Sequence, residues 1–548
     1  MKLNNWTLGL AAVGLVSLAS VAKADGQGTN SSSASTNSAP ASPPTTLSGT
    51  PIGTKANIGF FSRFDQAIRS DLGTPAYTPP PPVPAGTTPP PQANRRGNPT
   101  PFDSPPHPNG EWQIGGTEII GDPNLTPDWP LMEVLYAGPY GQFWSDSRIK
   151  FYGWEDFSGD ISTSTKGGLN PVTAQAANFP EVYDQRPNRL EQNQFVLYAE
   201  RTPDENQTDH IDWGFRLSQV YGLDYRYMIS RGWGSDQLLQ RNSFYGTDNP
   251  MMYFNLYIPN IAQGLNLTLG RIISMADIEA QLAPNNLMSS HSLLYGFDPY
   301  CQWGLFATLK LNNNWTVQGG ISAGNDVTPW ELNDPGTQPT GSVMVQYQSD
   351  NNKFGFYGGA NAFNNAQWGF NNIQQYVGTF TYKFNDKIWT SHESWFMYQE
   401  NCPGQTGGPG SSFGNPVPVR APDEPLGQLG GLGYTDAQYP VHPGYAAEWA
   451  TLNYTMFRLG PSTFFTIRNE VFDDIDGNRT GYACLYSEHS IGITWWPSKL
   501  ITVRPELRLD EAYGTHGTKN DPVDEAKPFD NGTRRTQLTA QMDVIFHF

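Results

Sequence analysis

The sequence lacks the long apolar run that a membrane-spanning helix requires. After residue 24, no stretch approaches about 18 uninterrupted apolar residues. The chain also has no glycine-rich phosphate loop and no cysteine–histidine spacing of the kind that binds zinc. Its three cysteines, Cys301, Cys402 and Cys484, follow no metal-binding pattern. These absences argue against a helical membrane protein, a zinc site and a nucleotide-binding loop.

Positive charge is the scarcer sign. Lys and Arg number 33 against 51 Asp and Glu, and the formal net charge of −18 argues against a nucleic-acid partner. Apolar residues make up 37%, which is low for a soluble globular protein. A membrane barrel can be this polar, because half of each strand faces its lumen. Aromatic residues, at 13%, are abundant enough for the interfacial girdles of such a barrel.

The N-terminus has the features of a secretory signal peptide over residues 1–24. Lys2 supplies the positive charge, residues 8–21 form an apolar core, and Ala22-Lys23-Ala24 offers a cleavage site. We therefore expect an exported protein in an oxidising compartment, where one disulfide can form. Cys402 and Cys484 both fall in expected long loops on one side of the molecule, which favours their pairing.

The composition of residues 25–147, which are rich in Pro, Ser and Gly, predicts a periplasmic extension. The tracts 27–51 and 75–108 cannot bury a core, so we expect a largely disordered segment with stiff proline-rich spacers. Between them, residues 58–72 carry large apolar side chains at helical spacing. They predict either a short amphipathic helix that docks on another part of the protein or a linker that is helical only transiently.

Strict alternation over residues 533–548 is the clearest positive signal in the chain. One face is apolar and consists of Leu538, Ala540, Met542, Val544, Phe546 and Phe548. The other is polar apart from Ile545 and consists of Gln537, Thr539, Gln541, Asp543 and His547. Side chains alternate between the faces of a strand, so this is a strand with one apolar and one polar face. A soluble protein seldom ends on such an exposed edge, whereas a membrane barrel closes its last strand on its first.

Similar short runs fill residues 148–548 and predict an antiparallel barrel of about sixteen strands. The expected strands are 148–157, 190–201, 211–222, 250–258, 264–273, 301–311, 315–324, 341–349, 353–361, 373–384, 387–398, 446–457, 462–472, 485–496, 501–510 and 534–548. Short turns alternate with long loops between them, as in outer-membrane up-and-down barrels. This parity predicts that both termini lie in the periplasm, and the long loop 399–445 is the expected constriction.

Charged residues are expected to line the lumen, because a charge on the lipid face costs about 2–4 kcal/mol near the bilayer midplane. In 501–510, Leu and Val alternate with Arg504, Glu506, Arg508 and Asp510. Such side chains must point inward, and we expect a polar, hydrated interior. The full set of candidates is Arg216, Lys310, Lys383, Arg468, Glu470, Arg504, Glu506, Arg508 and Asp510. They form either a constriction that selects solutes or wall pairs that stabilise neighbouring strands.

Several motifs of these strands resemble one family. They are Phe151-Tyr152-Gly153-Trp154, the run 193–201 (NQFVLYAER), Trp213-Gly214-Phe215-Arg216, the run 468–474 (RNEVFDD) and the run 476–481 (DGNRTG). Together with Phe548 they resemble the OmpL-like putative beta-barrel porin-2 family over about 148–548. The resemblance implies a diffusion channel without catalysis, and it does not cover the extension 25–147.

Two further groups of residues were considered as chemical sites. Asp473, Asp474, Asp476 and Asn478 surround Gly477 and suggest a Ca²⁺ turn, although no Glu occupies the last ligand position, and a solvated acidic turn is the alternative. Ser289, Ser290 and His291 are adjacent but lack a nucleophile elbow and an acidic partner in sequence. We therefore expect no enzyme and no cofactor.

The sequence thus predicts an outer-membrane porin that passes small hydrophilic solutes by passive diffusion. Its expected partners are outer-membrane lipid and these solutes, and by analogy with porins it forms a homotrimer. The alternative function is a structural or adhesive surface protein, which the barrel anchors and the extension 25–147 tethers to the periplasmic envelope.

Overall fold

The computed structural model describes residues 50–76, 128–165, 177–402 and 444–548. Within these ranges it leaves out residues 185, 240, 242, 274, 276, 333–335, 352, 368–370, 386, 476–478, 481–483 and 514–526. Among the described residues, no helix has the length and apolar character needed to cross a membrane.

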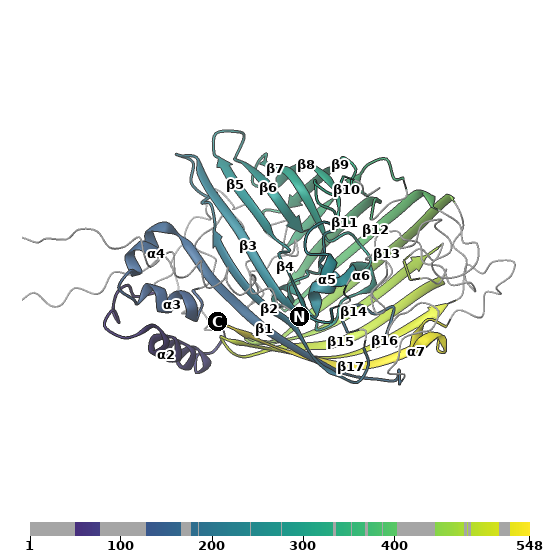
Figure 1. The fold of residues 1–548 in the computed structure, drawn as a ribbon, viewed down its shortest axis with the longest axis horizontal. Helices are drawn as coiled ribbons and strands as arrows, with labels where there is room; N and C mark the ends of the chain where they lie inside the picture. The colour runs from purple at the N-terminus through teal and green to yellow at the C-terminus, as the bar shows by residue number, and fades with distance from the viewer. Residues whose placement is uncertain are drawn as a thin grey trace, which may run out of the picture. The chain divides into compact units, whose positions relative to one another are not determined.

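One antiparallel sheet contains all the named strands and closes into a barrel (Figure 1). The strands are β1 (Ile149–Ser162), β2 (Leu190–Arg201), β3 (Asp212–Gly222), β4 (Gly246–Asp248), β5 (Met252–Ile258), β6 (Leu265–Ile273), β7 (Cys301–Lys310), β8 (Trp315–Asn325), β9 (Thr340–Gln348), β10 (Phe354–Phe363), β11 (Gln374–Asn385), β12 (Ile388–Cys402), β13 (Gly444–Gly460), β14 (Thr463–Asp474), β15 (Cys484–Ser498), β16 (Ile501–Tyr513) and β17 (Thr536–His547). The short β4 and β5 pair with successive parts of β3 and share one place in the barrel. The predicted 16-stranded barrel is confirmed.

The last strand closes the barrel on the first. β17 pairs with β1 from Trp154↔His547 to Ser162↔Thr539. The pairing is extended by Gly153 and Phe548, whose backbone groups exchange hydrogen bonds of 3.1 and 2.9 Å. A Cβ atom at position 153 would overlap the Val196 carbonyl oxygen and lie 2.9 Å from the Phe548 ring, so glycine there lets both β2 and the terminal aromatic approach β1 closely.

The alternation predicted for the last strand matches its burial. Met542 and Leu538 are 47% and 42% exposed, whereas Thr539 and Ile545 have no exposed surface. The same pattern runs through β15 and β16, where exposed and buried residues alternate. Apolar side chains therefore form the outer surface, and the polar residues of the strands point into the barrel.

Three helices pack at the short-turn end of the barrel, which is also the end where the chain terminates (Figure 1). They are α2 (Phe60–Leu72), α3 (Pro130–Tyr136) and α4 (Gly141–Ser147). The helix expected over 58–72 is present as α2, and Arg63 Nε donates to the Val134 carbonyl at 3.1 Å to join α2 to α3. The tracts 27–49 and 77–108 lie outside the described residues.

Lys499, in the turn between β15 and β16, connects the barrel to these helices. Its Nζ lies 2.7 Å from Asp71 of α2 and 2.8 Å from Glu133 of α3. Burial acts to lower the pKa of Lys499, but the hydrogen bonds to Asp71 and Glu133 outweigh it and raise the pKa above the usual lysine value. The ammonium group therefore stays charged at neutral pH and joins both helices to the barrel.

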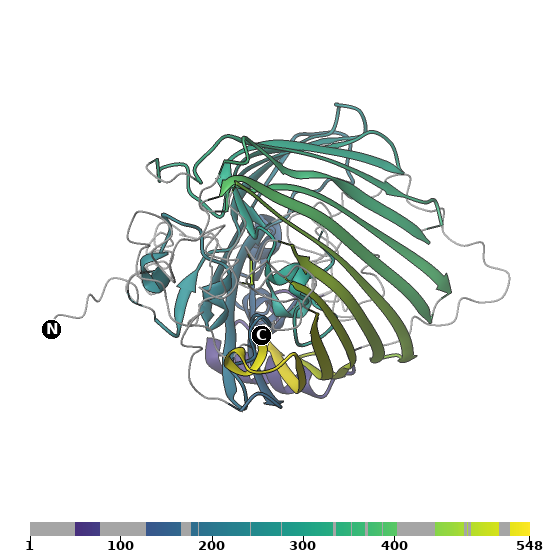
Figure 2. The ribbon, with the colours of Figure 1, turned by 90° about the vertical axis from the view of Figure 1, so that its right-hand side faces the viewer.

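The inside of the barrel is filled by residues 275–300, here called the infolded segment, which connects β6 to β7. It contains the short helices η3 (Ala283–Asn285) and α6 (Leu293–Gly296). Figure 2 shows this teal segment with the strands around it. Ile278, Leu282, Leu294 and Phe297 have no exposed surface. The remaining short helices are η2 (Asp224–Tyr227), α5 (Asp236–Leu239) and α7 (Phe529–Gly532).

Candidate functional site

The charged residues predicted for the lumen do point inward. Eight of the nine are at most 5% exposed: Arg216, Lys310, Arg468, Glu470, Arg504, Glu506, Arg508 and Asp510. Lys383 is half-buried at the end of β11. The prediction that these charges face water is wrong for the eight buried residues. The infolded segment covers much of the wall and supplies polar partners in place of solvent.

Arg468 of β14 lies at the centre of this network. Its guanidinium contacts Glu488 at 2.9 Å, Glu506 at 3.2 Å and Glu279 at 3.3 Å. It also donates to the Ser290 carbonyl at 2.8 Å. Glu488 and Glu506 belong to the wall, whereas Glu279 and Ser290 belong to the infolded segment. One cation thus joins two wall strands and the segment through charge-assisted bonds, the stronger class of hydrogen bond.

Two wall carboxylates bind backbone groups of the infolded segment. Glu470 accepts hydrogen bonds from the amides of Leu293, at 2.8 Å, and Leu294. Glu506 accepts from the Ser290 amide at 2.9 Å and the Ser290 hydroxyl at 2.6 Å. These amides would otherwise be buried without partners, which costs free energy. The wall charges therefore satisfy the backbone of the segment.

Two wall arginines bind its carbonyl groups. Arg504 pairs with Asp543 and donates to the carbonyls of Ala283 at 2.7 Å and Asn286 at 2.6 Å. Arg508 pairs with Asp510 at 2.8 Å and donates to the His291 carbonyl at 2.6 Å. Each of these arginines therefore forms an ion pair within the wall and also binds the infolded segment.

The opposite part of the wall carries its own pairs. Arg216 of β3 lies 2.8 Å from Glu200 of β2. Arg271 of β6 lies 2.8 Å from Asp248 of β4 and donates to the Asn249 carbonyl at 2.7 Å. Strict alternation would place Arg271 on the outer face with Leu269, which is 61% exposed. The intervening Gly270 has φ +139°, which interrupts the alternation, and Arg271 is fully buried. Sequence reasoning missed Arg271 for this reason.

The infolded segment was also missed, and the expected constriction, loop 399–445, lies mostly outside the described residues. A signal for the segment was available in its composition. Leu282, Leu287, Met288, Leu293 and Leu294 make it more apolar than a solvent-exposed loop needs to be. An apolar loop is stabilised when it packs against another surface and is removed from water. Here that surface is the inner wall of the barrel.

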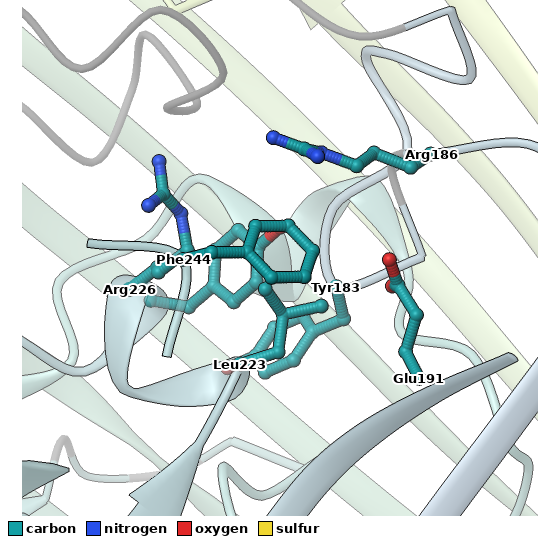
Figure 3. Close-up of a pocket in the computed structure, with 7 residues that line it drawn as sticks. Tyr183, Arg186, Glu191, Leu223, Arg226 and Phe244 are labelled. Carbon is teal, nitrogen blue, oxygen red and sulfur yellow. The ribbon is translucent and has the colours of Figure 1, made fainter. Parts of the chain in front are cut away.

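A small pocket lies between the connections that follow β1 and β3 and the start of β2 (Figure 3). It is lined by Tyr183, Arg186, Glu191, Leu223, Arg226, Tyr227 and Phe244. The Arg186 guanidinium lies 4.2 Å from the centroid of the Phe244 ring. Arginine and aromatic groups together favour polar ligands with a flat or anionic part.

The family model described as "Putative beta-barrel porin-2, OmpL-like" matches residues 156–548. The chain belongs to this family. Family membership and the closed barrel place this beta-barrel porin-2 protein in an outer membrane. No curated protein matches its sequence.

Among the solved structures that align with this chain are a porin and two outer-membrane proteins. An anion-selective porin from Comamonas acidovorans aligns with a TM-score of 0.42 at 9% identity, covering 73% of this chain and 99% of that one. The outer membrane channel DcaP of Acinetobacter baumannii aligns with 0.41 at 9%, covering 73% and 97%. The trimer form of OmpT from Vibrio cholerae aligns with 0.40 at 8%, covering 73% and 99%.

Two other predicted sites of the porin-2 chain gain no support. Asp473 accepts from Trp449 at 3.1 Å, and Asp474 Oδ2 accepts from the amides of Arg479 and Thr480 at 3.0 and 2.7 Å. Asp476 and Asn478 lie outside the described residues, so a Ca²⁺ turn there stays a prediction. Cys484 is a buried free thiol, which does not favour the Cys402–Cys484 disulfide, and the Cys402 side chain lies outside the described part.

Proposed function

We propose that this protein is an outer-membrane porin for small hydrophilic solutes and that the infolded segment is its constriction. The observation that carries the proposal is the inward row of charged residues on β14 and β16, which binds the segment through hydrogen bonds to its backbone and through an ion pair, alongside the apolar contacts of the shared core. Exchange of a protein hydrogen bond for one with water changes the free energy little. Solutes would pass along this polar wall when the segment moves from it.

The proposal includes an orientation. The short turns, the termini and helices α2 to α4 face the periplasm, and the long loops face outward, as the parity of outer-membrane barrels requires. Solutes entering from outside would first meet the pocket around Arg226 and Phe244. Deeper in the bore, the wall carries both arginines and carboxylates. Their mixed signs predict neither anion nor cation selectivity.

Single-channel recording tests the function directly. The purified full-length protein in a planar bilayer is expected to give small stepwise conductances, because the segment occupies the bore most of the time. Folding should be checked first by heat-modifiable electrophoretic migration. A folded sample that stays silent over many insertions would reject a porin.

A matched pair of variants tests the role assigned to the segment. Arg468→Ala removes contacts with Glu279 and Ser290 of the segment, so larger or more frequent openings are expected. Arg216→Ala removes an equally buried wall arginine, whose ion pair with Glu200 joins two strands. Its openings should resemble those of the parent protein. Equal behaviour of the two variants would contradict the assignment.

One observation favours the alternative function of a structural surface anchor. Eight of the nine charged residues predicted for the lumen are buried, and the N-terminal helices are attached to the barrel through Lys499. In that case the barrel is a plugged anchor, and residues 77–127 reach the envelope. Shortening 77–127 should then remove the protein from the detergent-insoluble envelope fraction, whereas conductance through a porin does not need this attachment.

A further inference from the structure

Three buried carboxylates meet where the two ends of the infolded segment approach β12. Asp277 lies near the start of the segment, Asp298 near its end, and Glu393 on the wall. One oxygen from each lies within 4.8 Å of the others. Oxygens that ligate one Ca²⁺ at about 2.4 Å each can lie at most about 4.8 Å apart, so the spacing suits a single ion.

The protein around this cluster leaves ligand positions open. Glu393 Oε2 accepts a hydrogen bond from the Ile278 amide at 2.7 Å, which fixes the carboxylate, while Oε1 has no partner among the described residues. Apart from its carboxyl neighbour Asp277, Asp298 likewise has no hydrogen-bond partner in that part of the chain. Both side chains are at least 98% buried, with exposures of 0% and 2%.

A buried hydroxyl group adds a second, independent sign of a ligand. The Tyr295 hydroxyl has no hydrogen-bond partner among the described residues, and the side chain is 1% exposed. Asp277 and Asp298 are among the groups that act electrostatically on it. Most buried polar atoms in proteins have partners, so a buried hydroxyl without one indicates a missing partner, and its oxygen is a suitable ligand for a cation.

The main electrostatic neighbours of two members of the cluster, Asp298 and Glu393, are acidic. The main electrostatic neighbours of Asp298 are Asp277, Glu393 and Asp326, all acidic. Those of Glu393 include Glu279 and Glu470. Carboxylates in an acidic environment are costly to bury, and carboxylate and hydroxyl oxygens are the ligands that hard divalent cations prefer.

We propose that Asp277, Asp298 and Glu393 bind one divalent cation, with Ca²⁺ the best match to an all-oxygen site. The ion would join both ends of the infolded segment to β12 and so stabilise its position in the bore. Shared protons could instead neutralise the three groups, and the experiment below separates these two cases.

The test uses the full-length protein in detergent, treated with EDTA, dialysed and titrated with CaCl₂. Calorimetry should show one Ca²⁺ bound per chain, and the melting temperature should be higher in Ca²⁺ than in EDTA. Asp298→Asn and Glu393→Gln should each weaken binding about tenfold or more. Asp209→Asn removes an exposed carboxylate in the β2–β3 connection and should bind as the parent does.

Two results would overturn the proposal. Absence of Ca²⁺ binding and of a cation-dependent melting temperature in the folded parent protein would mean that protons neutralise the cluster. Parent-like affinity in both Asp298→Asn and Glu393→Gln would place any bound ion elsewhere. If a variant fails to fold, the Ca²⁺ titration of the parent protein alone decides whether a cation binds. Neither readout depends on whether the barrel conducts.

Discussion

At the scale of the residue, the buried ion pairs have two tasks. Arg504 neutralises Asp543 on the neighbouring strand and also binds two carbonyls of the infolded segment. Both charged side chains are 2% exposed, so neither can regain water if its partner is removed. A buried pair adds little net stability over apolar residues, but breaking it leaves an uncompensated charge.

We expect Arg504→Ala to lower the free energy of unfolding by about 3–5 kcal/mol, because Asp543 is left buried and unpaired. Unfolding in urea, followed by tryptophan fluorescence, measures the change. Combining Arg504→Ala with Asp543→Leu should recover part of the loss. The control Arg241→Ala breaks an exposed pair with Asp236 and should leave the stability unchanged. If Arg504→Ala were as stable as the parent, the pair would have no such structural role.

At the scale of the element, the helices at the short-turn end are attached to the barrel by several contacts, among them the Lys150–Asp128 ion pair at 3.2 Å and the stacked rings of Trp129 and His547. Lys499 is central, because it binds Asp71 and Glu133 and its backbone amide donates to the Thr74 carbonyl at 2.9 Å. Its raised pKa means that this contribution is present at neutral pH and is lost only as the pH rises above the usual lysine range.

Lys499→Ala should therefore loosen α2 and α3 by about 1 kcal/mol without opening the barrel. Limited proteolysis should cut residues 50–76 faster, while the barrel fragment stays heat-modifiable. Lys387→Ala, in the β11–β12 turn, removes an exposed lysine at the same end and should be cut at the parental rate. Equal rates for both variants would show that Lys499 does not secure the helices.

The strands were predictable because neighbouring residues of a barrel strand face lipid and lumen in turn, so apolar and polar side chains alternate along it. Leu538, Thr539 and Ile545 lie on the faces that alternation assigns to them, although Ile545 is apolar. The α2 helix was visible in the spacing of its aromatic side chains. The infolded segment was not predictable in this way. Its contacts with Glu470 and Arg468 join residues that are 177 and 178 positions apart in the sequence, and no local pattern encodes such contacts. The acidic cluster was missed for the same reason.

At the scale of the whole molecule, barrel wall and infolded segment share one core, in which apolar side chains and ion pairs lie together inside an apolar outer surface. Without the segment, the wall charges would keep their ion pairs with one another but lose their bonds to its backbone. The segment alone would expose leucines to water. Constriction, cation binding and the stability of the wall therefore all depend on the position of the segment in the bore.

A reversible crosslink between the infolded segment and the wall tests whether the segment lies in the bore. Ser290→Cys and Glu506→Cys are combined in a background whose native cysteines are replaced by serine, because Ser290 Oγ lies 2.6 Å from Glu506 Oε1. A cysteine side chain is shorter than glutamate, so a short bifunctional methanethiosulfonate is used to join the two thiols. We expect the pair to crosslink in the folded protein, with a single-channel conductance that falls on crosslinking and recovers on reduction. A folded protein in which the two cysteines never crosslink, or in which the conductance is the same before and after reduction, would show that the segment does not occupy the bore.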